Sequence, residues 1–347
     1  MNAPNNIKTE GPQPPVSLPP SRLEPDDARS VRGVALYVLS THGLLIFGIV
    51  LAIIFAILLP GTFAGIQTVR AILGNNTTVA LLAMAEMLVI AGGNYDLSVA
   101  YSIGLMHIIA MSLVVWAGVP WPLVVVITIL AGGLVGWING ALVEYAKIDS
   151  FIATLGVGTV LYGIGTFITN GTQVVGVVPE WFADINDARL LGLPFPTYLV
   201  VLVAIIAWIC LEHLPLGRHL YAIGSNRRAA ELTGVNSRRL IMGSFVWSGL
   251  LVGLAGVILA ARLQVAQSSV GPEFLLPAFV GALLGATTVR PGRVNAAGTI
   301  IAVLVLAVGI AGLQQLGNSF FVEPIFQGGA LIVSVGLAGY AARRRKT

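Results

Sequence analysis

The feature that most constrains this chain is a series of apolar stretches, each about as long as a membrane helix. A helix needs about 20 mainly apolar residues to cross the hydrocarbon core of a bilayer. Ten candidate stretches occur along the sequence: 35–59, 76–92, 98–117, 121–145, 150–169, 195–213, 239–262, 274–289, 295–316 and 324–342. A short apolar run would fit the core of a soluble protein, whereas ten in series predict an all-α integral membrane protein with about ten transmembrane helices.

The composition agrees with a bilayer environment. Charged residues make up 10% of the chain and hydrophobic residues 56%, whereas a soluble domain carries about 25% charged residues. The 41 glycines suit helices that pack closely in lipid. The single cysteine, Cys210, lies in an apolar stretch, which excludes a disulfide framework and a cysteine-rich metal site. No catalytic motif or metal-ligand spacing occurs, so we expect neither catalytic residues nor a bound metal.

The lysine and arginine residues determine the expected orientation, because cytoplasmic loops of membrane proteins are rich in both. With both termini placed in the cytoplasm, only Arg70, Arg189 and Arg262 of the 19 lysine and arginine residues fall outside. This distribution predicts cytoplasmic termini and an even number of spans. The basic residues lie between apolar stretches rather than on one face, which argues against nucleic acid as a partner.

The chain is expected to have three parts. Residues 1–33 are polar and rich in proline, which predicts a disordered cytoplasmic tail. A cleavable signal is not expected, because its apolar core would follow closely behind Met1. Residues 34–342 form the transmembrane domain, and residues 343–347 form a basic cytoplasmic tail.

Two of the ten stretches, 76–92 and 274–289, are short and run into polar segments that contain glycine or proline, AGGNYDLS and TTVRPGR. Such sequences are typical of broken or re-entrant helices. Backbone groups freed at membrane depth are tolerated where they are buried in protein or line an aqueous path. We therefore expect the segment 92–98 and the matching break at 285–293 to lie towards a solute path or its gate. Alternatively, Asp96 caps the helix that is expected to begin at Ser98.

A few polar residues within or beside the apolar stretches are candidates for lining a solute path, because polar groups at membrane depth are costly. They are Glu86, Asn94, Asp96, His107, Asn139 and Gln314. Glu86 and His107 would suit a proton relay, or equally a hydrogen bond between two helices; the sequence leaves both open. Glycines that recur every fourth residue, at 132/136/140, 249/253 and 281/285, predict close helix packing.

The largest cytoplasmic segment, 214–240, contains a short basic helix by its own signals. Ser225 or Asn226 can cap a helix start, residues 227–233 form two turns, and Gly234 stands where a helix commonly ends. Such a helix is too small to fold alone, and it would make sense as a surface that docks into another protein. The alternative is an ordinary cytoplasmic loop, which would be rich in lysine and arginine like other cytoplasmic loops.

No nucleotide site is expected in this chain. A P-loop requires a lysine that follows a glycine-rich loop, and the only lysines, Lys8, Lys147 and Lys346, follow none. The chain is therefore expected to bind no cofactor, and any ATPase that drives transport would be another polypeptide.

Five segments occur in a fixed order: MLVIAGGNYDLSVA (87–100), GWINGALVEYAKIDSFIATLG (136–156), GRHLYAIGSNRRAAELTGVN (217–236), ARLQVAQSSVGPEFLLPA (261–278) and GATTVRPGRVNAAGT (285–299). Together they resemble the permease subunits of bacterial monosaccharide ABC importers, in the ribose/xylose/arabinose branch. Asn94-Tyr95 stands where that family has a single isoleucine, and TTVRPGR replaces a more glycine-rich turn. The sugar is therefore not carried over from the family.

The resemblance implies a homodimer of permeases in the cytoplasmic (inner) membrane that imports a monosaccharide or similar polyol. It also implies a pair of cytoplasmic ATPase subunits that bind ATP and magnesium, and a periplasmic sugar-binding protein. The segment 214–240 would then hold the coupling helix. The residues that match this element are Gly217, Arg218, Asn226, Arg227, Arg228, Ala229, Ala230, Glu231 and Gly234. Two competing hypotheses are a proton-coupled secondary transporter that works through Glu86 and His107, and a passive channel.

Overall fold

The computed structural model describes residues 31–317 and 321–332. The expected N-terminal tail up to residue 30, the basic tail 343–347 and the part of the last expected span beyond residue 332 lie outside the described residues. The chain divides into two units, residues 1–39 and 40–347.

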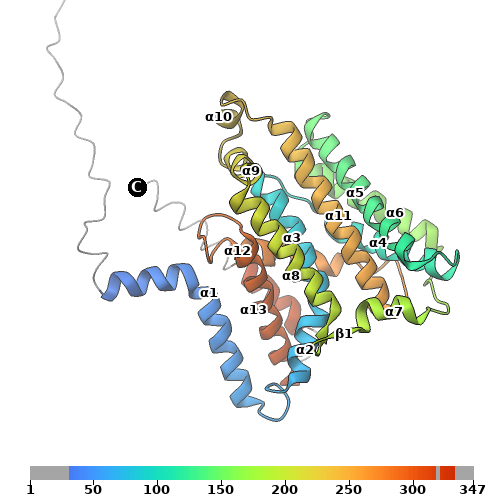
Figure 1. The fold of residues 1–347 in the computed structure, drawn as a ribbon, viewed down its shortest axis with the longest axis horizontal. Helices are drawn as coiled ribbons and strands as arrows, with labels where there is room; N and C mark the ends of the chain where they lie inside the picture. The colour runs from blue at the N-terminus through green and yellow to red at the C-terminus, as the bar shows by residue number, and fades with distance from the viewer. Residues whose placement is uncertain (1–30, 318–320, 333–347) are drawn as a thin grey trace, which may run out of the picture. The chain divides into compact units, whose positions relative to one another are not determined.

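The described chain is almost entirely helical (Figure 1). Its first half contains α1 (Val31–Leu58), α2 (Ile66–Asn75), α3 (Thr77–Ala91), α4 (Ser98–Val115), α5 (Trp121–Glu144) and α6 (Ser150–Thr169). Its second half contains α7 (Glu180–Asp187), α8 (Phe195–Trp208), the π-helical turn η2 (Ile209–His213), α9 (Pro215–Ser225), α10 (Arg227–Leu232), α11 (Ser237–Leu263), the 3-10 turn η3 (Pro272–Phe274), α12 (Leu275–Gly285) and α13 (Ala296–Gln315). A small antiparallel hairpin pairs β1 (Arg189–Leu190) with β2 (Leu193–Pro194).

Within the described residues, seven helices are long and apolar enough to cross a membrane. The number is eight if α2 and α3, which meet at a bend of 44°, count as one broken span. The helical, multi-span fold expected from the sequence is confirmed, but the described residues do not confirm the expected count of ten. The stretch 274–289 forms only the short helix α12, and the stretch 324–342 is described as helix only over 322–332.

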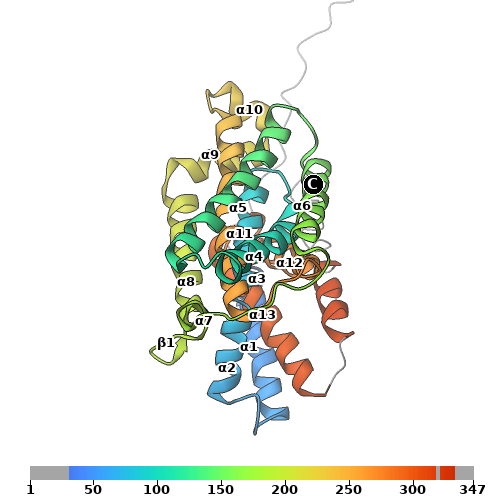
Figure 2. The ribbon, with the colours of Figure 1, turned by 90° about the vertical axis from the view of Figure 1, so that its right-hand side faces the viewer.

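The long helix α11 lies at the centre of the bundle and packs against α3, α4 and α5 (Figures 1 and 2). The contact between α5 and α11 depends on glycine. A Cβ atom at Gly136 would lie 2.1 Å from the backbone oxygen of Phe245, and one at Gly249 would lie 2.2 Å from the backbone oxygen of Gly132. The glycine spacing seen in the sequence therefore marks two backbones in direct contact, as expected.

The exposure of apolar side chains also indicates a bilayer. Almost every residue of α3 is buried, because its neighbours surround it. In contrast, α5 and α6 expose large apolar side chains such as Leu130 and Phe167 on their outer faces. These faces would be unfavourable in water, whereas lipid is as apolar as the side chains themselves.

Candidate functional site

The segment 214–240 contains the short helix that the sequence predicts. α10 begins after Asn226, whose side-chain oxygen accepts a hydrogen bond from the backbone N–H of Ala229 at 3.0 Å. The helix ends before Gly234, which has a φ of 86° in the left-handed region that favours glycine. Gly217 allows α9 to start close to η2, because a Cβ atom there would lie 2.2 Å from the backbone oxygen of Leu211.

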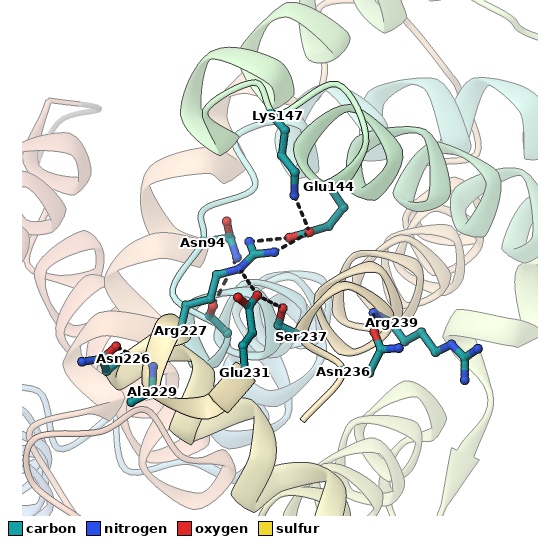
Figure 3. A network of polar contacts seen from close by, with 11 residues as sticks. Asn94, Glu144, Lys147, Asn226, Arg227, Ala229, Glu231, Asn236, Ser237 and Arg239 are labelled. Atoms are coloured by element: carbon teal, nitrogen blue, oxygen red, sulfur yellow. Dashed lines mark hydrogen bonds and ion pairs between the residues drawn. The ribbon is translucent and has the colours of Figure 1, made fainter. Parts of the chain in front are cut away.

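A buried carboxylate ties α10 to the end of α5 (Figure 3). Arg227 donates from both terminal nitrogens to Glu144, at 2.8 Å to Oε1 and 2.7 Å to Oε2. The Glu144 side chain is 0% exposed and that of Arg227 is 38% exposed. Lys147, at 3.3 Å, is a second partner of the same carboxylate. A buried carboxylate is tolerated when it is paired and hydrogen-bonded. Arg227 therefore stabilises Glu144, the last residue of α5, in its buried position.

The same arginine links α10 to the start of α11. Its Nε donates to Glu231 at 3.0 Å, and the Ser237 hydroxyl donates to the same carboxylate. The Ser237 hydroxyl and then the Arg227 guanidinium hold the pKa of Glu231 below its usual value. Hydrogen bonds to Glu144 and Glu231 raise the pKa of Arg227. We call Glu144, Lys147, Arg227, Glu231 and Ser237 the coupling clamp.

The other predicted coupling residues fall into two groups. Ala230 is buried in a small apolar cluster with Val143 of α5 and Phe245 of α11. Arg218, Arg228 and Ala229 are exposed. The predicted set therefore contains side chains that hold α10 to the bundle and side chains that face outwards, a division that the sequence does not show.

Asp96, in the first helix break, joins three parts of the bundle. Its Oδ1 accepts hydrogen bonds from the backbone N–H and the hydroxyl of Ser98, at 3.1 and 2.6 Å, and from Asn139 of α5 at 3.3 Å. Its Oδ2 accepts from the hydroxyl of Ser248 in α11 at 3.4 Å. The bond from the Ser98 amide lies at the start of α4, but Leu97 occupies the N-cap position there and makes no side-chain cap, so both expectations for Asp96 stay predictions.

The rest of the first break contacts neighbouring helices through its backbone, although Gly93 and Tyr95 are exposed. The backbone N–H of Tyr95 donates to Ser150 and that of Leu97 to Thr154, both on α6. Gly93 packs on α9, where a Cβ atom would lie 3.1 Å from the Cα of Gly224. Asn94 lies beside the coupling clamp (Figure 3). Backbone groups in the break thus receive partners from neighbouring helices, one of the two ways in which such a break is tolerated.

The second break, between α12 and α13, also contacts α9. The Tyr221 hydroxyl donates to the backbone oxygen of Val294 at 2.8 Å, and the guanidinium of Arg293 lies 4.3 Å from the centre of the Tyr221 ring. Arg290 and Arg293 both pair with Glu212 of η2, whose side chain is 5% exposed. Both breaks therefore contact α9, and the second break also contacts η2.

Besides Asn94, three predicted path residues, Glu86, His107 and Gln314, make no hydrogen bond to the Asp96 side chain within the described residues. Within the described residues no hydrogen bond joins Glu86 to His107, so the direct bond that the sequence left open between them does not form. His107 instead pairs with the backbone of Gly104 and Gln267. Glu86 is buried near Asp96, and its carboxyl oxygens lack a well-formed hydrogen bond in the described chain. Gln314 is exposed near the end of α13 and bonds to Glu323.

Sequence reasoning missed Glu144, Glu212 and Ser248. Glu144 offered a signal, because it is the only charged residue in the stretch 121–145 and precedes Lys147 by three positions. Glu212 offered a weaker one at the end of 195–213. Nothing in the local sequence around Ser248 predicts its contact with a residue 152 positions away.

A helical bundle with several spans, interrupted helices and a small basic helix clamped to two of the spans defines a membrane permease subunit. The chain belongs to the family described as branched-chain amino acid transport system, permease component, which matches residues 68–335. It is a multi-pass protein of the inner membrane.

The relatives confirm the resemblance to permeases of sugar ABC importers. The ribose import permease protein RbsC of Haemophilus influenzae is 31% identical over 86% of this chain and 92% of its own length. RbsC of Bacillus subtilis is 33% identical over 74% of this chain and 79% of its own length. The autoinducer 2 import system permease protein LsrD of Escherichia coli K12 is 31% identical over the same shares, 74% and 79%. No solved structure was found that matches the chain.

Proposed function

We propose that this chain is the membrane-spanning subunit of an ATP-driven importer that moves a monosaccharide or similar polyol into the cytoplasm. Two copies form the translocation unit, a separate pair of ATPase subunits binds to their cytoplasmic ends, and a periplasmic binding protein delivers the solute.

The coupling clamp is the observation that carries this proposal. α10 presents exposed side chains on the cytoplasmic end of the bundle, while its Arg227 is bonded to Glu144 of α5. A partner that moves α10 therefore pulls on α5 and, through Glu231 and Ser237, on α11.

The movement has a path to both helix breaks. Asn139 lies five residues before Glu144 on α5 and donates to Asp96 and Ser98. α9, which directly precedes α10, contacts the break at Gly93. We propose that a shift of α9 and α10 alters the hydrogen bonds of Asp96 and the conformation of both breaks together. This change opens the solute path to one side of the membrane at a time, as a rigid-body coupling between two packed states.

The substrate class follows the relatives. The two RbsC proteins carry the name of ribose, and LsrD that of autoinducer 2, whereas the family description refers to branched-chain amino acids. We favour a monosaccharide or polyol because the first two relatives above are ribose permeases. Thermal-shift screening of the cognate binding protein against sugars, polyols and branched-chain amino acids tests this choice, and stabilisation by an amino acid alone would overturn it.

ATP coupling is tested by reversing exposed charges on the cytoplasmic segment. The double variant Arg218→Glu/Arg228→Glu should insert normally but bind the ATPase weakly, because both side chains are exposed and docking between charged surfaces is sensitive to sign. Reversal of an exposed charge at the opposite end, Asp184→Lys, is the matched control. Normal ATP-dependent uptake in proteoliposomes by the double variant would refute the docking role of this segment.

Glu86 supports a second candidate, a proton-coupled transporter that needs no ATPase. A buried carboxyl group without a well-formed hydrogen bond is a group that can exchange a proton with a transport path. Uptake driven by an imposed proton gradient in vesicles without ATPase, and its loss in Glu86→Gln, would favour this candidate. Uptake that requires ATP and persists in Glu86→Gln favours the importer.

A further inference from the structure

The three arginines that are expected on the extracytoplasmic side lie around one cavity. Arg70 of α2, Arg189 of β1 and Arg262 near the end of α11 line a single cavity of about 350 Å³. Two of the elements that line it, α2 and β1, lie at the end of the bundle opposite α10 (Figures 1 and 2), which is the extracytoplasmic end in the expected orientation. The cationic residues expected outside are therefore gathered around one hollow rather than scattered over the surface.

Local contacts hold these guanidinium groups in place without neutralising them. Nε of Arg70 donates to the backbone oxygen of Gly192 at 2.7 Å, and Nη1 of Arg262 donates to that of Asn75 at 2.8 Å. Arg189 is exposed, and within the described residues none of the three arginines forms an ion pair or bonds to a carboxylate. Each therefore keeps N–H donors for a ligand.

The hairpin that carries Arg189 has a defined shape. Leu191 and Gly192 both have positive φ, 50° and 82°, which is the backbone of the tight turns that join two-residue hairpins. The bond from Arg70 to the Gly192 oxygen fixes this turn to α2. The position of Arg189 at the cavity is thus set by the fold and not by a free loop.

The charges lining the cavity favour an anion. Asp187 is the one acidic residue among its lining, against three arginines. A guanidinium presents paired N–H donors that match the oxygens of a phosphate or carboxylate group. The polar residues Gln67, Asn75 and Asn186 also line the cavity and add further donors.

The rim of the cavity favours a lipid as the source of that anion. Leu191 at the hairpin tip is 91% exposed, and Leu190 and Ile66 beside the lining residues are 51% and 55% exposed. Trp181 on α7 is also exposed, and tryptophan is enriched where proteins meet the membrane–water interface. A cationic hollow beside large exposed apolar side chains matches a molecule with an anionic headgroup and acyl chains.

We propose that this cavity binds the phosphate group of an anionic phospholipid in the outer leaflet of the inner membrane. Arg189 and the free donors of Arg70 and Arg262 contact the phosphate, while Leu190 and Leu191 contact the acyl region. The proposal goes beyond the proposed transport function and does not depend on which solute is carried.

The test measures lipid binding to the purified, delipidated full-length chain. Native mass spectrometry follows the binding of added phosphatidylglycerol, of zwitterionic phosphatidylcholine and of soluble glycerol 3-phosphate. The wild type should bind phosphatidylglycerol in preference to both others. Arg189→Glu should weaken that binding about tenfold or more, since it replaces a charge-assisted hydrogen bond with repulsion.

Two variants provide controls. Arg189→Lys keeps the charge and should retain most of the binding, and Arg239→Glu reverses an exposed charge at the cytoplasmic end and should bind like the wild type. Because the Arg189 side chain makes no hydrogen bond or ion pair within the described residues, its variants should fold, and their thermal unfolding midpoint checks this.

Three outcomes would overturn the proposal. Unchanged phosphatidylglycerol binding by Arg189→Glu would remove the site. Equally tight binding of glycerol 3-phosphate would assign the cavity to a free phosphate. If Arg189→Glu binds lipid normally but loses the uptake that depends on the binding protein, the arginines bind an acidic surface of a protein instead. The binding assay contains no ATPase and no solute, so a failure of the transport proposal leaves it unaffected.

Discussion

The charge pair between Arg227 and Glu144 predicts a measurable energetic coupling between α10 and α5. The test is a double-mutant cycle with Arg227→Gln, Glu144→Gln and the double variant. Arg227→Gln leaves the buried Glu144 carboxylate with Lys147, at 3.3 Å, as its remaining cationic partner. Glu144→Gln leaves Arg227 paired with Glu231 at 3.0 Å. The first single variant should therefore cost more than the second.

The magnitude follows from burial. Removing one partner of a fully buried ion pair costs about 3–5 kcal/mol. Arg227 is 38% exposed, so solvent screening reduces the interaction, and exposed pairs contribute at most about 1 kcal/mol. A bidentate pair with one fully buried member lies between these limits. We expect a coupling free energy of about 1–2 kcal/mol.

The measurement is the free energy of unfolding of each variant in mixed micelles, accompanied by ATP hydrolysis and uptake in proteoliposomes with the ATPase. Glu144→Gln should still bind the ATPase but show less uptake per ATP hydrolysed, because α10 no longer pulls on α5. A coupling free energy below about 0.5 kcal/mol is within the range of independent sites. That result, together with normal uptake per ATP, would show that the clamp neither stabilises nor transmits.

Further predictions follow from other contacts. Gly136→Ala should destabilise the protein by about 1–3 kcal/mol or more, because its Cβ atom would lie 2.1 Å from a backbone oxygen of α11. Gly243→Ala is the control and should not destabilise it, because nothing lies within 4 Å of a Cβ atom there. Equal free energies of unfolding for the two variants would contradict this packing. Asp96→Ala should cost about 1–3 kcal/mol and Asp96→Asn less; loss of expression in both without altered transport per molecule would make Asp96 purely structural. The pKa of Glu231 is lowered in the folded protein, so the stabilisation it provides is complete above its ordinary pKa of 4.5 and is lost as pH falls through the lower pKa of the folded state. Glu231→Gln should remove this pH dependence from the thermal unfolding midpoint. A reporter active only in the periplasm should stay silent when fused after Thr347, and activity there would require an odd number of spans.

Local signals were sufficient to predict the short helix α10 and the close glycine contact between α5 and α11. Asn226 caps α10 and Gly234 ends it because capping and left-handed backbone depend on one or two adjacent residues. Gly136 and Gly249 lie in contact because four-residue spacing places small residues on one helix face. The number of spans was not predictable in the same way, since a short apolar stretch can end as a bent pair or as a short helix.

The lengths of the apolar stretches and the distribution of charged residues by themselves determined that this chain is a multi-span membrane protein. The bilayer has a fixed thickness, and each stretch must be long enough to cross it. The tertiary structure alone decided the partners of the polar groups. Glu144 finds Arg227 across 83 positions, and Arg70 and Arg262 meet Arg189 at one cavity. Such pairings depend on how helices are arranged around one another, and in lipid that arrangement comes from close packing and buried hydrogen bonds, which no single stretch of sequence contains.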